Sequence, residues 1–84
     1  MPRYFIDTFD HIVAIDDVGC DLPDEDAARK LVRETLAEML ASEHKGQSSA
    51  QYRAEVRDEV GKPVLTGSVL IVIDKAPISV ARSI

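Results

Sequence analysis

The stretch L-P-D-E-D-A-A-R-K-L-V-R-E-T-L-A-E-M-L, residues 22–40, carries the clearest structural pattern of the 84-residue chain. Its apolar residues recur at intervals of three and four, which places them on one face of an α-helix. Asp24 precedes the pattern as a good N-cap, and two more acidic residues follow it, where carboxylates suit the helix dipole. The pattern predicts one amphipathic helix that starts after Asp24 and ends near residues 43–45, before Gly46.

The chain on the N-terminal side of this helix favours a β-hairpin. Residues 3–9 are rich in aromatic and β-branched side chains, and residues 12–15 form a second such run after a short Asp10-His11 turn. A turn at residues 16–19 follows, and residues 20–22 can add a short extended piece. We therefore expect a first hairpin followed by an aspartate-rich turn.

The chain on the C-terminal side favours a second hairpin. Residues 51–58 alternate between apolar and charged side chains, which predicts a strand with one buried and one exposed face. A turn at residues 58–61 leads to a final strand over residues 63–74. Both faces of this strand are apolar, with Val64, Leu70 and Val72 on one and Leu65, Val69, Ile71 and Ile73 on the other.

These elements predict an α+β fold of the order ββαββ, in which one helix covers one face of a four-stranded antiparallel sheet made of two hairpins. A strand order of 2-1-3-4 gives the crossover through the helix its usual right-handed sense. The chain has room for a single core, so we expect one domain over residues 1–74. Residues 75–84 form a tail that either adds a short strand at residues 78–81 or frays.

Composition narrows the range of partners. The net charge is −5, and residues 1–26 hold eight acidic residues against one basic residue. An acidic chain is unsuited to binding a phosphate backbone, so no nucleic-acid partner is expected. The apolar run at residues 69–73 is too short to cross a membrane, and the N-terminus lacks the apolar core of a signal peptide. The single cysteine, Cys20, fits a reducing compartment, so we expect a soluble, cytoplasmic protein without a membrane partner.

No catalytic or cofactor-binding motif is present, so we expect no enzyme activity and no cofactor. Asp16, Asp17 and Asp21 are weak candidates for a divalent cation site, because hard cations take carboxylate oxygens. Their spacing does not match the calcium-loop pattern. Turn and capping roles explain these residues equally, so cation binding at this turn is kept as an alternative and no metal is expected.

Several short motifs resemble those of a family of short bacterial proteins known only as a domain of unknown function. The resemblance runs over residues 1–74 and rests on M-P-R-Y-F-I-D at residues 1–7, the acidic turn that closes at Gly19, L-P-D with A-A at residues 22–24 and 27–28, E-V-R-D at residues 55–58 and G-K-P-V at residues 61–64. It implies no activity and no site. Cys20 and the length of the tail depart from the family pattern.

The final strand supplies the leading functional hypothesis. One helix can cover only one face of the sheet, so a strand that is apolar on both faces needs cover from the tail, a second copy or another protein. We take Leu65, Val69, Ile71 and Ile73 as interface candidates. They predict a small non-enzymatic protein-interaction module, homodimeric through its sheet. An antitoxin-like regulatory protein that binds a small partner protein is the alternative, based on fold-level likeness alone.

Overall fold

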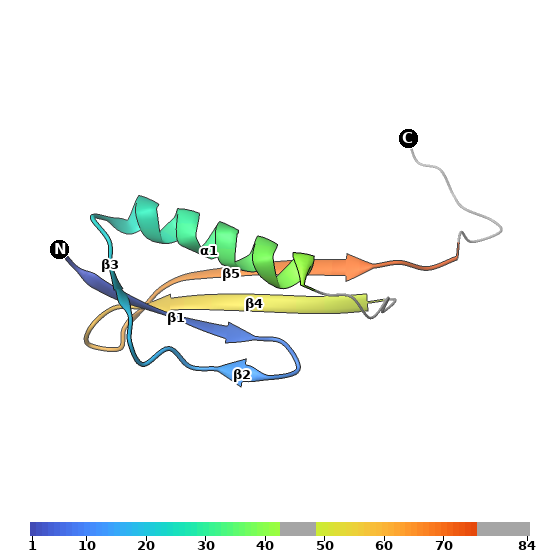
Figure 1. Ribbon diagram of the computed structural model, residues 1–84, viewed down its shortest axis with the longest axis horizontal. Helices are drawn as coiled ribbons and strands as arrows, with labels where there is room; N and C mark the ends of the chain where they lie inside the picture. Colours follow the sequence, from blue (N-terminus) through green and yellow to red (C-terminus); the bar gives the residue numbers. More distant parts are fainter. Residues whose placement is uncertain (43–48, 76–84) are drawn as a thin grey trace.

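A computed structural model describes residues 1–42 and 49–75. Its elements are, in order, β1 (Arg3–Phe9), β2 (Val13–Ala14), β3 (Cys20–Asp21), α1 (Glu25–Ala41), β4 (Ser49–Arg57) and β5 (Pro63–Val72). The strands form an antiparallel sheet, and α1 lies along one of its faces (Figure 1). The predicted α+β fold with ββαββ order is confirmed.

The sheet runs in the order β2-β1-β4-β5, which is the predicted 2-1-3-4 order of the two hairpins. β3 is the short extended piece expected at residues 20–22, and it pairs with β1 as a fifth strand beyond the four predicted. β1 and β4 lie side by side although α1 separates them in sequence, and Ile6 is the register partner of Val56. The crossover through α1 therefore joins the two hairpins into one sheet.

The structure confirms the predicted start of α1 and places its end earlier than predicted. The Asp24 carboxylate accepts a hydrogen bond of 2.9 Å from the backbone N–H of Ala27, which confirms the N-cap. The helix ends at Ala41 with Ser42 as C-cap, ahead of the predicted end near residues 43–45, which lie outside the described residues. The tail strand predicted at residues 78–81 lies outside them as well.

Within the described ranges, no helix combines the length and apolar character needed to cross a membrane.

The core lies where α1 crosses the pair of strands β4 and β5. Ala28 and Val32 of the helix are buried against Ala54 and Val56 of β4. Ala54 is the register partner of Gly67 on β5, so two of the smallest residues lie side by side beneath the helix. A Cβ atom at Gly67 would lie 2.6 Å from the Cγ1 atom of Val32. The small residues therefore allow the helix to approach the sheet closely.

We expect Gly67→Ala to lower the free energy of unfolding by about 1–2 kcal/mol, since overpacking a core forces side chains and backbone to shift. Val32 cannot move aside easily, because a β-branched side chain in a helix has one strongly preferred rotamer. Urea denaturation followed by circular dichroism measures the change. Ser68→Ala, at the exposed neighbouring position, is the control and should stay close to the parent. Equal stability of the two variants would contradict the close approach of α1.

Candidate functional site

β5 is an edge strand with an unusual lack of charge. Within residues 1–42 and 49–75 it pairs with β4 alone, so the backbone groups on its outer side have no strand partner there. No charged residue occurs between Lys62 and Asp74. Edge strands in natural proteins are commonly blunted by charges, bulges or prolines, because an open edge is a template for another strand. β5 carries its one proline, Pro63, at its first position and a register shift beside it at Val64, so the regular pairing edge runs from Leu65 to Val72.

The two faces of β5 have different surroundings. Leu65, Val69 and Ile71 lie on the face covered by α1 and are half-buried. Leu70 and Val72 lie on the open face, where each is 64% exposed. The predicted alternation of β5 is present from Leu65 to Val72, and the open face carries the more exposed residues. Val64, expected on the same face as Leu70 and Val72, packs against the core instead, because the register of β4 and β5 shifts at this position.

The interface candidates therefore have unequal access to a partner. Leu65, Val69 and Ile71 are reached from the helix side of the edge, whereas Ile73 lies just past the end of β5 and is 65% exposed. Leu70 was not among the candidates, because alternation separates two faces without saying which one the helix covers. Gly67 could have identified the face that the helix covers, because a glycine inside a strand often marks a close approach of another backbone.

A groove runs between α1 and the outer edge of β5. Its volume is about 430 Å³. The apolar part of its lining includes Leu36 and Leu40 of the helix and Leu65 and Val69 of the strand. Arg29 and Arg33 also line it from the helix. The groove thus adds apolar side chains of α1 to the apolar surface beside the β5 edge.

The rest of the open face is covered by paired charges. The Arg53 guanidinium lies 4.3 Å from the centre of the Phe9 ring and forms a 3.2 Å ion pair with Glu55. Arg57 lies 4.8 Å from the centre of the Phe5 ring. Each of these arginines lies over the face of an aromatic ring, where the ring attracts a cation electrostatically. The open face is therefore polar over β1 and β4 and apolar over the end of β5.

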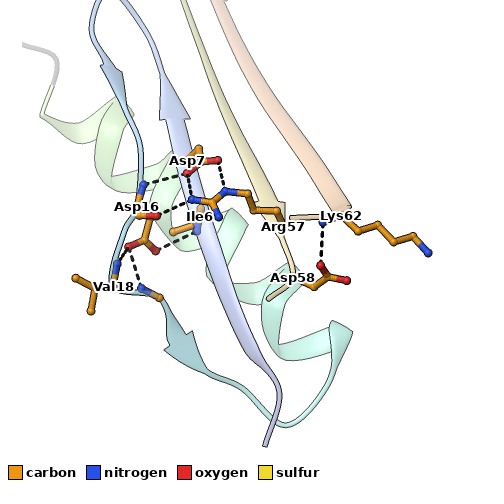
Figure 2. Close-up of polar contacts among 8 residues, drawn as sticks. Ile6, Asp7, Asp16, Val18, Arg57, Asp58 and Lys62 are labelled. Atoms are coloured by element: carbon orange, nitrogen blue, oxygen red, sulfur yellow. Dashed lines mark hydrogen bonds and ion pairs between the residues drawn. The ribbon is translucent and has the colours of Figure 1, made fainter. Parts of the chain in front are cut away.

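The opposite edge of the sheet is interrupted by an aspartate-rich bulge. Between the Thr8–Ala14 pair and the Tyr4–Cys20 pair, β1 advances by four residues while the edge chain advances by six. The two extra residues make the chain bulge around Asp16, between β2 and β3 (Figure 2). This bulge breaks the pairing edge that β2 and β3 would otherwise form.

The Asp16 carboxylate holds the bulge in place. It accepts hydrogen bonds of 3.0–3.1 Å from three backbone N–H groups, those of Ile6, Val18 and Gly19. Burial by itself raises the pKa of the Asp16 carboxyl. The three N–H donors, together with the charge of Arg57, outweigh that effect, so the pKa lies below its ordinary value of 3.8.

Asp7 and Arg57 connect this bulge to the centre of the sheet. The Asp7 carboxylate, only 7% exposed as a residue, accepts from the backbone N–H of Asp16 at 3.0 Å and from the Arg57 Nε at 2.9 Å. A terminal nitrogen of Arg57 also donates to the backbone oxygen of Asp16 at 2.6 Å (Figure 2). The hydrogen bond to Asp7 is the main cause that raises the pKa of Arg57 above its ordinary value. The three residues therefore form a closed network across β1, β4 and the bulge.

The three candidate metal ligands are not brought together as a set. The Asp16 oxygens are engaged by backbone N–H donors, and Asp21 forms a 3.5 Å ion pair with Arg3. Asp17 is exposed. In the part of the chain that the structure describes, no group of three or more His, Cys, Asp or Glu residues is placed to hold a metal ion. Asp16 thus has a structural role at this turn, while cation binding stays an untested prediction.

The family comparison covers most of the chain. Residues 3–70 match the family described as Domain of unknown function (DUF6894). The chain belongs to the DUF6894 family. The expectation of an uncharacterised domain family is thereby confirmed, whereas the bacterial source and the opening motifs stay predictions. No curated protein and no solved structure matches this DUF6894 chain.

We expect Asp16→Asn to destabilise the fold by about 1–3 kcal/mol at neutral pH, because an amide group replaces an oxygen that faces N–H donors. Since the pKa of Asp16 is lower in the folded chain than in the unfolded chain, its carboxylate stabilises the fold above pH 3.8 and loses that contribution as the pH falls through the folded value. The difference in stability between parent and variant should therefore shrink below pH 3.8.

Chemical denaturation at a series of pH values between 2 and 7 measures this difference. Asp17→Asn removes the neighbouring exposed carboxylate and serves as the control, with stability close to the parent throughout. A gap between parent and Asp16→Asn that stays constant down to the lowest pH would contradict the role given to the Asp16 charge.

Proposed function

We propose that the chain is a small non-enzymatic protein-interaction module that self-associates through its sheet. The observation that carries this proposal is the outer edge of β5, which is long, uncharged and paired on one side only within the described residues. Leu70, Val72 and Ile73 are each about two-thirds exposed beside it. Burial of one side chain of this size contributes about 1.5–3 kcal/mol, so covering this edge gives a substantial driving force.

The distribution of charge favours pairing at the edge over stacking of two open faces. Face-to-face stacking would bury Arg53, Glu55 and Arg57 together with their partners, and taking ion pairs out of water is costly. Pairing along β5 leaves these groups in water. The edge is therefore the part of the sheet that a partner can cover at the lower cost.

The same distribution favours a second copy as the partner. Asp10, Asp16, Asp17 and Asp21 lie along the opposite edge, in or beside β2 and β3. That edge is three strand spacings from β5, which is about 14 Å. Two copies joined at β5 would thus keep their acidic edges on the outside of the assembly. A net charge of −5 per copy is then compatible with association.

Light scattering coupled to size-exclusion chromatography, at tens of micromolar chain, should give twice the chain mass of 9.2 kDa. We expect Leu70→Lys to raise the dissociation constant of the dimer about tenfold or more, because it places a charge on the apolar edge of both copies. Its circular dichroism spectrum should match that of the parent, since Leu70 is already 64% exposed.

Val60→Lys is the matched control, because Val60 is 86% exposed and lies in the turn before β5. It changes the charge in the same way and should leave the mass of the assembly unchanged. A parent chain that elutes as a monomer would overturn the proposed self-association. Equal weakening by both variants would show that net charge, and not the β5 edge, controls assembly.

A further inference from the structure

We infer that the groove between α1 and the outer edge of β5 binds an extended segment of another protein, one that carries acidic side chains beside apolar ones. The segment adds to the sheet as a further strand next to β5. The groove has a volume of about 430 Å³ and takes its lining from both elements. This inference goes beyond the proposed self-association, because it names a second partner that competes with the second copy for the same edge.

The backbone of β5 favours a peptide strand over a lipid or another apolar ligand. Thr66, Gly67 and Ser68 line the groove in the middle of β5. Within the described residues no strand pairs with the outer side of β5, so its N–H and C=O groups are open there. A peptide in extended conformation can pair with these groups through its own backbone, whereas an acyl chain cannot. The regular stretch from Leu65 to Val72 gives such a peptide a continuous edge.

Two arginines of α1 give the groove its charge. Arg29 and Arg33 are exposed, lie one helical turn apart and line the groove. Among the described residues, neither of them forms an ion pair. Two like charges at this spacing repel each other and destabilise a helix slightly. A carboxylate placed beside both relieves this repulsion, and the planar guanidinium group suits carboxylate recognition. The two arginines therefore favour an acidic partner.

The charge and the apolar side chains occupy different ends of the groove. α1 and β5 run in the same direction (Figure 1). Arg29 and Arg33 come first along the helix, so the basic end lies beside the first half of β5. Leu36 and Leu40 follow them, so the apolar end lies beside the second half. A strand that pairs antiparallel to β5 therefore matches the groove when its helix-facing positions are apolar first and acidic last.

The chain's own segments beyond Lys62 do not supply this charge. Residues 63–84 contain one acidic residue, Asp74, which lies past the end of β5. The β5 strand of a second copy thus covers the open backbone but brings no acidic side chain to the arginines. Charge complementarity therefore favours a different protein as the occupant of the groove.

The negative net charge of the chain does not oppose an acidic partner at this place. Of the described residues that line the groove, none is acidic. Residues 27–84 hold nine basic and seven acidic residues, so the acidic excess belongs to residues 1–26. The edge with β2 and β3 is three strand spacings from β5, about 14 Å, which exceeds the Debye length of about 8 Å at physiological ionic strength. Arg29 and Arg33 therefore dominate the charge of the groove.

Fluorescence anisotropy with labelled synthetic peptides tests the inference on the full chain. The probe is a peptide of about eight residues with blocked ends, which matches the length from Leu65 to Val72. Its helix-facing positions are two valines followed by two glutamates, with threonine at the alternate positions. Replacement of the glutamates by glutamines should weaken binding about tenfold or more, and high salt should remove this difference. Replacement of the valines by serines should also weaken binding. A glutamine peptide that binds as tightly as the probe overturns the acidic specificity.

Variants of the chain test the arginines directly. Arg33→Glu should weaken binding of the glutamate peptide about tenfold, and it should strengthen binding of a peptide with lysines in place of the glutamates. Lys30→Glu is the matched control, because Lys30 is exposed and does not line the groove. It changes the net charge equally and should have little effect. Equal weakening by the two variants overturns the role of the groove.

Backbone methylation of the peptide tests whether it binds as a strand. In an antiparallel ladder, alternate residues direct their N–H groups toward the same neighbouring strand. Two peptides, N-methylated at the odd or at the even positions, therefore each lose the N–H groups of one side. One of them should keep the affinity of the unmodified probe, and the other should lose binding. Equal effects of the two modifications overturn strand addition at β5.

Light scattering in the presence of saturating glutamate peptide separates this inference from the proposed function. A dimer that the peptide converts into monomers supports both. A dimer without preference for the glutamate peptide overturns the inference and leaves self-association standing. A parent chain that is monomeric but binds the peptide overturns self-association and leaves the inference standing. Binding of the peptide to an intact dimer overturns its placement at the β5 edge.

Discussion

The close packing of α1 on the Ala54–Gly67 pair determines how the rest of the molecule is covered. Because both residues are small, the helix approaches the sheet closely enough to bury Ala28 and Val32. The helix in this position shields one face of β4 and β5, and no other described helix or strand covers their second face (Figure 1). Among the described residues, Val56 is the largest side chain that is fully buried. So small a core leaves little margin of stability, and domains of this size commonly gain support from assembly.

The polar network at the other edge holds a buried charge in place. Asp7 is a buried carboxylate, and burying a charge is costly unless it is paired and hydrogen-bonded. Arg57 supplies the opposite charge at 2.9 Å, and the backbone of the bulge supplies further hydrogen bonds. Removing either partner would leave an uncompensated charge. The network therefore joins β1, β4 and the bulge into one rigid unit.

Local patterns in the sequence predicted the elements, whereas contacts between distant residues could not be predicted. The spacing of apolar residues placed α1, and Asp24 marked its start, because both signals lie within a few residues. The Asp7–Arg57 pair spans 50 residues, and alternation in β1 and β4 gave only the face on which each lies. The similar turns at residues 16–19 and 58–61 were visible, and both close with a glycine of positive φ. That Asp16 also bonds to Ile6 depends on the register of β1, which no local pattern contains.

In the proposed self-association, the difference between the two edges of the sheet limits how many copies can join. The β2–β3 edge is broken by a bulge and carries several aspartates, and both features oppose the addition of another strand. The β5 edge has no charge, and its pairing with β4 is regular from Leu65 to Val72, after a register shift at Val64. A chain with two open edges could add copies without limit and form fibres. A chain with one open edge that pairs with itself closes after two copies, because the two-fold contact uses the edge of both. In the proposed self-association, the bulge around Asp16 has a second role beside stability, because it leaves β5 as the edge available for pairing.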